Sequence, residues 1–264
     1  MLLKDKVVII SGIGPGLGVK LAVESAREGA TGIVVAARTQ DKLDDAEKRI
    51  HAVAKQCRVL KQVTDITDRK QCERLVEAAV KTFGRIDALV NSAFVHGDMD
   101  YASSANLDSW ISGPIGTNLI GTLKLTQAVT AQMKKQKSGA IVMINTMAVR
   151  QVPPLGEAGY AASKAALATS AMYLAKELAP SGIRVNTVHI GWMWGAPVQG
   201  YVAWQAKELK VPEEQLKAQI ASGIPLGRIP TDDECARPAL FLVSDYASAV
   251  TGAALDVNGG AYMP

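Results

Sequence analysis

A tyrosine and a lysine four residues apart have the types and spacing of a catalytic pair. Tyr160 and Lys164 stand near the start of an expected helix that runs to about Ala179. Residues four apart share one face of a helix. A free phenol has a pKa of about 10, and a nearby ammonium favours the phenolate, so the pair could exchange a proton with an alcohol or a carbonyl. A surface tyrosine and lysine on an alanine-rich helix are the alternative interpretation.

A glycine-rich turn follows the first apolar run of the chain, Val7–Ile10. Its spacing is G-x-x-x-G-x-G, carried by Gly12, Gly16 and Gly18, with Leu17 between the last two. Glycines let the backbone turn tightly and approach a pyrophosphate, and the following helix presents N–H donors and the positive end of its dipole. The turn therefore predicts a dinucleotide site, although the spacing is not G-x-G-x-x-G and a plain flexible turn is the alternative.

Two later residues bear on the adenosine half of such a cofactor. Arg38 lies about 20 residues after the glycine turn, where an acid would bind the 2′-OH of NAD and an arginine would suit a 2′-phosphate. No acid stands there, which favours NADP and leaves NAD possible. Asp65 follows the third apolar run and could hydrogen-bond the adenine, but a turn or N-cap aspartate explains it as well.

Seven short apolar runs, several of them β-branched, alternate with amphipathic stretches along the chain. This alternation predicts an α/β fold in which a parallel sheet of about seven strands is covered by helices on both faces. Since no linker interrupts the pattern, we expect one domain over residues 1–264. The runs are Val7–Ile10, Ile33–Ala36, Val59–Val63, Ile86–Val90, Ala140–Ile144, Val185–Ile190 and Ala253–Val257.

Two segments interrupt the alternation. At Gly113-Pro114 the missing proline N–H predicts that one helix ends and another begins. The second segment, at about 192–224, is a long insertion after a strand and is typical of a substrate lid. Its tryptophans are candidates for an apolar substrate wall. They are Trp192, Trp194 and Trp204.

Composition limits the possible functions. The chain has 264 residues, of which 48% are hydrophobic and 20% charged, with a formal net charge of +4, so it is not a disordered chain. Its basic residues form no dense tract, which disfavours nucleic acid, and no apolar run is long enough for a membrane span. Three widely spaced cysteines match no metal-ligand spacing, so we expect no metal site and a cytoplasmic location. His96 could line a substrate mouth, but a loop histidine without a role explains it better.

Taken in order and over nearly the whole chain, these motifs resemble the short-chain dehydrogenase/reductase superfamily, of its small single-domain type. The resemblance implies a Rossmann-type, doubly wound fold and a hydride passed between C4 of a nicotinamide and a carbinol carbon. Homo-oligomers, tetramers or dimers, are common in that family. The resemblance is carried by Ser11–Gly18, Asp65, Asn91-Ser92-Ala93, Asn118, Thr146, Tyr160 with Lys164, Val185-Asn186 with Gly191, and Asp256–Gly260.

The resemblance also implies a role for each matching residue. Tyr160 would be the general acid in reduction and the general base in oxidation. Lys164 would lower the pKa of that tyrosine and hold the nicotinamide ribose. Asn118 would keep a water in the proton relay, and Asn91 would steady the cofactor. The backbone around Gly191 would border the nicotinamide pocket.

The chain departs from the family pattern at four positions. Thr146 stands where the family usually has the serine that polarises the substrate, and it keeps the hydroxyl. Phe94 replaces a glycine and puts a bulky ring near the site. Ile190 replaces the proline before Gly191. Pro15 stands where many NADP-using relatives carry a basic residue, which leaves Arg38 as the main candidate for a 2′-phosphate.

Together these features predict an NADP-preferring alcohol dehydrogenase or carbonyl reductase that acts on a bulky, apolar alcohol or ketone. A reductase of 3-oxoacyl thioesters or of steroid-like ketones is one alternative. A dinucleotide-binding regulatory protein without turnover is another, because Thr146, Phe94 and Ile190 depart from the pattern. The retained Tyr160 and Lys164 argue against the regulatory protein.

Overall fold

Seven parallel strands form one sheet in the order β3-β2-β1-β4-β5-β6-β7. The structure is a computed structural model and describes residues 1–153 and 156–264. The sheet confirms the predicted α/β class, and every predicted apolar run coincides or overlaps with a strand. The strands are β1 Val7–Ser11, β2 Gly32–Ala37, β3 Arg58–Val63, β4 Ala88–Asn91, β5 Gly139–Thr146, β6 Ile183–Ile190 and β7 Ala254–Val257.

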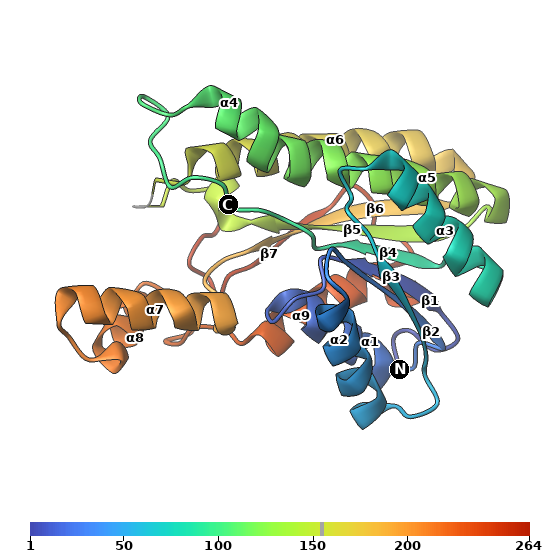
Figure 1. Cartoon of the computed structure of the whole chain (residues 1–264), viewed down its shortest axis with the longest axis horizontal. Coiled ribbons are helices and arrows are strands. Elements are labelled where there is room, and N and C mark those ends of the chain that lie inside the picture. The colour runs from blue at the N-terminus through green and yellow to red at the C-terminus, as the bar shows by residue number, and fades with distance from the viewer. Residues whose placement is uncertain (154–155) are drawn as a thin grey trace.

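Helices cover both faces of the sheet (Figure 1). One face carries α1 (Leu17–Arg27), α2 (Gln40–Val53) and α9 (Asp232–Val243). The other carries α3 (Arg69–Phe83), α5 (Thr122–Gln136) and α6 (Ala158–Leu178). Successive side chains of β1 alternate between the two layers, because a strand has a side-chain period of two. The chain winds outward from β1 to β3 and then in the opposite direction from β4 to β7, so the topological switch point lies between β1 and β4.

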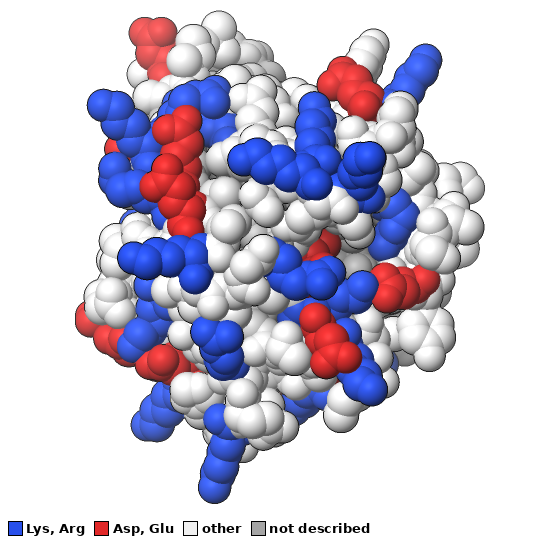
Figure 2. Space-filling model, turned by 90° about the vertical axis from the view of Figure 1, so that its right-hand side faces the viewer, with Lys and Arg blue, Asp and Glu red and all other residues white. Residues whose placement is uncertain are grey.

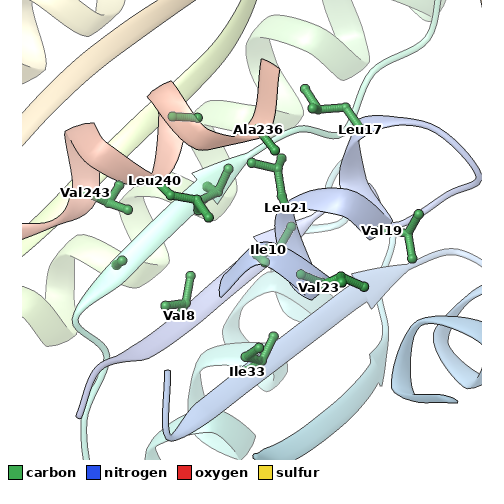
Figure 3. Packing of buried hydrophobic residues seen from close by; sticks show 14 of the residues in the cluster. Val8, Ile10, Leu17, Val19, Leu21, Val23, Ile33, Ala236, Leu240 and Val243 are labelled. Carbon is green, nitrogen blue, oxygen red and sulfur yellow. The ribbon is translucent and has the colours of Figure 1, made fainter. Parts of the chain in front are cut away.

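The packing of α1 fixes the start of that helix against the end of β1 (Figure 3). Leu21 of α1 and Leu240 of α9 are fully buried beside Val8 and Ile10 of β1. Each fully buried side chain of this size contributes roughly 1.5–3 kcal/mol from the area removed from water. The turn between β1 and α1 is therefore held by two rigid elements.

A continuous helical stretch replaces the break predicted at Gly113-Pro114. It runs through α4 (Leu107–Trp110), the π-helix η1 (Ile111–Gly121) and α5. The prediction is wrong because Pro114 lies within the π-helix, whose wider turn bonds each N–H to the carbonyl five residues back. That geometry relieves the clash between the proline ring and the carbonyl four residues back, which would break an α-helix. Asp68 is the N-cap of α3, and its side chain accepts from two backbone N–H groups.

The segment after β6 forms two helices, α7 (Ala196–Leu209) and α8 (Glu213–Ser222), which project beside one end of the sheet (Figure 1). They share a small apolar cluster made by Val202, Ala206 and Leu216. The described residues also include the short 3-10 helices η2 Met147–Val149, η3 Ala179–Ser181 and η4 Asp245–Ala247.

Two surface properties accompany this fold. Across residues 1–153 and 156–264, no helix combines the length and the hydropathy needed to cross a bilayer. Figure 2 shows Lys and Arg side chains spread over one face of the molecule, with Asp and Glu side chains among them.

Candidate active site

The predicted site residues gather at the carboxyl ends of four neighbouring strands. Ser11 at the end of β1 is paired in register with Asn91 at the end of β4. Thr146 at the end of β5 is paired with Ile190 at the end of β6. In an open α/β sheet, this edge at the switch point is where ligands bind. The fold therefore brings residues from distant parts of the sequence to one edge.

The glycine turn leaves no space for side chains at two of its positions. A Cβ on Gly12 would lie 2.6 Å from the Ser92 carbonyl carbon, and Gly12 has a φ of +82°, which favours glycine. A Cβ on Gly18 would lie 2.9 Å from the Gly12 carbonyl carbon and closer still to its oxygen. Gly16 is the N-cap of α1 and makes no side-chain cap, and the first turn of α1 has no acidic residue. The first N–H groups of α1 are thus suited to an anion such as a pyrophosphate.

Two buried polar atoms beside the turn support a polar ligand there. In the described part of the chain, Ser11 Oγ and Asn91 Oδ1 are buried and have no hydrogen-bond partner. Buried polar atoms are nearly always paired, so orphans of this kind call for an explanation. Asn91 Nδ2 meanwhile donates to Thr126 Oγ1 at 3.0 Å, which fixes its orientation.

The two candidates for the adenosine half have different settings. Arg38 directly follows β2 and is exposed. Asp65 lies in a tight turn, where its Oδ1 accepts from the backbone N–H of Thr67 at 2.9 Å and from the Thr67 hydroxyl at 2.7 Å. The turn therefore accounts for one carboxylate oxygen of Asp65.

Tyr160 and Lys164 lie on one face of α6 and meet the end of β5. The Thr146 hydroxyl lies beside the Tyr160 phenol. Lys164 Nζ donates to the Ile144 carbonyl oxygen at 2.8 Å and lies 5.9 Å from the centre of the Tyr160 ring. Asn145 Nδ2 donates to the Lys164 carbonyl oxygen at 2.9 Å, so two hydrogen bonds join β5 and α6 at Lys164.

Burial dominates the acidity of both groups. It raises the pKa of Tyr160 above its ordinary value, the Glu157 carboxylate adds to that rise, and the neighbouring Thr146 hydroxyl opposes it. Burial lowers the pKa of Lys164 to about 7. The structure thus differs from the expectation that Lys164 lowers the tyrosine pKa, because the desolvated ammonium is itself disfavoured and bonds a carbonyl. Near neutral pH the phenol remains protonated and can act as an acid.

Asn118 has a structural function that the sequence did not reveal. It lies in the π-helix η1 and is fully buried. Its Oδ1 accepts from the Val95 N–H at 2.8 Å, and its Nδ2 donates to the Val95 carbonyl at 2.9 Å and to Ser163 Oγ at 2.9 Å. The side chain therefore joins the loop after β4 to α6, next to Tyr160.

Two rings from the loop after β4 surround the tyrosine. Phe94 is half exposed, and its ring centroid lies 6.0 Å from that of Tyr160. The His96 imidazole stacks on the Tyr160 ring, with 4.5 Å between the ring centroids and an interplanar angle of 13°. Its Nε2 lies 2.9 Å from Glu157 Oε2. The loop histidine of the sequence analysis therefore contacts both Tyr160 and Glu157. Glu157 stands three residues before Tyr160, and this helical spacing is the only sequence signal that could have indicated it.

The far side of the site contains Gly191 and the start of the segment 192–224. A Cβ on Gly191 would lie 2.7 Å from Asn258 Cβ, so this strand end admits no side chain. Trp192 contacts Tyr201 at 5.8 Å between ring centroids, and Tyr201 contacts Trp204 at 6.2 Å. Lys217 Nζ lies 4.8 Å above the Trp194 ring. In the described part of the chain, the aromatic and cation–π contacts of these tryptophans lie within residues 192–224.

Comparison with known proteins agrees with this geometry. A family model described as "Enoyl-(Acyl carrier protein) reductase" matches residues 12–262. The 3-oxoacyl-[acyl-carrier-protein] reductase of Thermotoga maritima is 36% identical over 260 residues, covering 98% of this chain and 99% of the relative. The chain belongs to the short-chain dehydrogenase/reductase superfamily.

Other members extend the comparison. L-rhamnose 1-dehydrogenase (NAD(P)(+)) of Azotobacter vinelandii is 32% identical and covers 100% of this chain and 99% of the relative. The crystal structure of levodione reductase superposes with a TM-score of 0.90 at 28% identity, covering 98% of each chain. This short-chain dehydrogenase/reductase is accordingly an NAD(P)-dependent oxidoreductase that transfers a hydride between a nicotinamide and an alcohol or ketone.

Proposed function

We propose that this enzyme is an NADP-preferring carbonyl reductase and alcohol dehydrogenase for bulky, apolar substrates, with Tyr160 as its general acid and base. The observation that carries the proposal is the placement of the Tyr160 phenol beside the Thr146 hydroxyl, with Lys164 one helical turn further along α6. A protonated phenol beside a second hydroxyl can bind one carbonyl oxygen from two sides. That arrangement suits a reaction in which negative charge develops on oxygen.

Each residue of the group has a distinct task in this proposal. In the direction of reduction, the Tyr160 hydroxyl donates its proton to the carbonyl oxygen, and the Thr146 hydroxyl donates a hydrogen bond to it. Lys164 holds the nicotinamide ribose, and its positive charge, when present, stabilises the tyrosinate that remains. Asn118 fixes the loop after β4 against α6 through Val95. The bound nicotinamide supplies or accepts the hydride.

Several residues would hold the cofactor. The N–H groups at the start of α1 and the glycines of the turn would bind the pyrophosphate. Ser11 and Asn91 supply polar atoms beside it, and Gly191 keeps the edge of the nicotinamide pocket free of a side chain. The exposed Arg38, together with the absence of an acid at the end of β2, supports NADP. NAD is the alternative cofactor, because the name of the similar L-rhamnose 1-dehydrogenase specifies NAD(P)(+).

Residues 192–224 are proposed as the substrate lid. Pro197 at the start of α7 lies 3.4 Å from the position of a Cβ on Gly16, so the segment begins beside the glycine turn. Trp192, Tyr201 and Trp204 form a row of aromatic rings on it, and Phe94 adds a half-exposed ring beside Tyr160. Apolar walls of this kind favour an apolar substrate.

Reduction of a 3-oxoacyl thioester is the second candidate function. The 36% identical relative from Thermotoga maritima carries that activity in its name and aligns over its whole length. Both candidates use the same acid, so only the substrate separates them.

Self-association and a reducing, cytoplasmic setting complete the proposal. Ile111 on η1 and Met172 and Tyr173 on α6 are exposed large apolar side chains, which supports a homo-oligomer, a dimer or a tetramer. A hollow of about 270 Å³ between α6 and β7 adds to this surface. The three cysteines are free and buried, which suits a reducing compartment. Light scattering of the purified protein measures the assembly directly.

The deciding experiment pairs a substitution with a substrate panel. Wild type and Tyr160→Phe are assayed with NADPH and NADH against apolar ketones and a 3-oxoacyl thioester. Tyr160→Phe keeps the ring, and we expect turnover to fall about 10²–10⁴-fold while NADPH binding stays within about threefold. Tyr173→Phe, on the exposed face of α6, is the matched control and retains turnover. Wild-type turnover by Tyr160→Phe contradicts the assigned chemistry, and a preference for the thioester selects the second candidate.

A further inference from the structure

A histidine and a glutamate far apart in the sequence meet at the catalytic tyrosine. His96 comes from the loop after β4, and Glu157 is the N-cap of α6. The imidazole Nε2 and the Glu157 Oε2 are 2.9 Å apart, and the imidazole lies nearly parallel to the Tyr160 ring at 4.5 Å. The Glu157 side chain is only 11% exposed, so solvent screens its charge weakly.

The loop holds His96 in this place from both sides. Asn118 binds both the N–H and the carbonyl of Val95, directly before it. Gly97, directly after it, has a φ of +79°, and a Cβ there would lie 2.9 Å from Pro114 Cδ. The π-helix η1 therefore fixes the backbone on each side of the imidazole. A ring anchored in this way can keep a defined distance from the tyrosine.

The charged and titratable groups around Tyr160 come from three elements. Glu157 and Lys164 stand one helical turn to either side of it on α6. Thr146 of β5 lies beside the phenol, and His96 covers the ring from the loop after β4. That loop also carries Asp98 and Asp100, and Asp100 Oδ1 accepts from Trp110 Nε1 at 3.3 Å. Of these groups, Glu157 opposes ionisation of the tyrosine, since two nearby negative charges repel.

We propose that His96 and Glu157 form a positioning pair that sets the ionisation of Tyr160. The proposal rests on the proposed function, in which Tyr160 exchanges the proton. By donating from Nε2, His96 neutralises part of the Glu157 charge, and this keeps the tyrosinate accessible in the direction of alcohol oxidation. Glu157 in turn keeps the phenol protonated for reduction. The two residues act on the same group with opposite sign.

The opposite signs define the test. In Glu157→Gln the amide preserves size and can still bind His96, so Tyr160 should ionise about one pH unit lower. In His96→Phe the stacked ring remains but the carboxylate is unneutralised, so Tyr160 should ionise about one pH unit higher. Glu77→Gln on the exposed side of α3 and His51→Phe on α2 are the matched controls. They should leave the midpoint of Tyr160 ionisation unchanged.

Two readouts separate this proposal from the proposed function. Tyrosinate absorbance, taken as the difference between each variant and the same variant carrying Tyr160→Phe, follows ionisation of Tyr160 without substrate. The pH profile of NADP⁺-dependent oxidation of the most active alcohol in the panel follows the same group during turnover. Full activity of Tyr160→Phe would contradict the proposed function. The absorbance measurement would still test whether His96 and Glu157 shift the ionisation of Tyr160.

The pair is supported only by midpoint shifts of opposite direction in the two variants, in absorbance and in the oxidation profile. Shifts in the same direction, or no shift, overturn it. A merely structural role would lower activity without moving the midpoint of Tyr160 ionisation in opposite directions in the two variants. If His96→Phe folds poorly, His96→Asn, whose amide can still donate to Glu157, takes its place and should shift the midpoint less than Glu157→Gln does. A larger shift in His96→Asn also overturns the pair.

Discussion

Replacing Gly18 by alanine should damage both stability and cofactor binding. A Cβ at this position meets three backbone atoms of the turn and lies 2.9 Å from the Gly12 carbonyl carbon and 3.1 Å from Ile13 Cα. Backbone atoms cannot rotate away, so the start of α1 and the turn must separate. Overpacking of this kind costs roughly 1–3 kcal/mol. For a chain of this size, we expect the melting temperature to fall by about 2–10 °C.

Gly14→Ala is the matched control within the same turn. A Cβ on Gly14 has no heavy atom within 4 Å, and Gly14 does not have a positive φ. Its melting temperature should therefore stay within about 1 °C of wild type. Thermal unfolding monitored by tryptophan fluorescence measures both variants, and NADPH fluorescence titration measures their affinities. We expect at least a tenfold loss of affinity in Gly18→Ala, because displacement of the turn misplaces the pyrophosphate donors.

The comparison has a clear contrary outcome. Equal melting temperatures for Gly18→Ala and wild type would mean that the turn moves freely. The close contact between Gly18 and Gly12 would then not fix the conformation of the glycine turn. Unchanged NADPH affinity in a destabilised Gly18→Ala would instead show that the pyrophosphate binds elsewhere.

Three further predictions concern the chemistry of the site. Thr146→Ser should retain turnover, whereas Thr146→Val should lower kcat by about 10²-fold, since an oxyanion donor is typically worth roughly 3 kcal/mol; preserved kcat in the valine variant would show that the hydroxyl is unused. Lys164→Met should abolish turnover yet raise the unfolding free energy at pH 7, because the buried lysine, with its pKa lowered to about 7, holds fewer protons than its unfolded form. That gain should shrink as the pH is raised from 7 towards 10 in thermal melts, and a constant gain would contradict the lowered pKa. Ala37→Asp combined with Arg38→Ile should shift the affinity ratio from NADPH towards NADH, and a wild type that already prefers NADH refutes the role of Arg38.

The parallel sheet was predictable because its signal is local. Each strand has its own short apolar run, and turns and N-caps such as Asp68 stand next to the helices that they begin. The helix through Pro114 was not predictable from the residue alone. Whether proline breaks a helix depends on the hydrogen-bond register, which here is set by the packing of Asn118 on Val95 and Ser163.

Some features of the candidate site were likewise predictable from the sequence, and others were not. The spacing of Tyr160 and Lys164 on one helix face follows from helix geometry, and the structure has both on α6. The contact between His96 and Glu157 joins residues 61 positions apart, which no short pattern records. The direction of the Tyr160 pKa shift also required the structure, since burial and the neighbouring Glu157 carboxylate outweigh the opposing effect of Thr146.

The two outer strands of the sheet bear on how the chain avoids aggregation. An edge strand offers unpaired N–H and C=O groups to any extended segment, including one from another unfolded copy. β3, at one edge, carries Arg58 and Lys61, and the Lys61 ammonium is held between Asp44 and Glu47 of α2. β7, at the other edge, is only four residues long and contains Asp256. Charge at one edge and shortness at the other disfavour strand addition, so refolding at high protein concentration should depend on Arg58 and Lys61 even though neither lies near the active site.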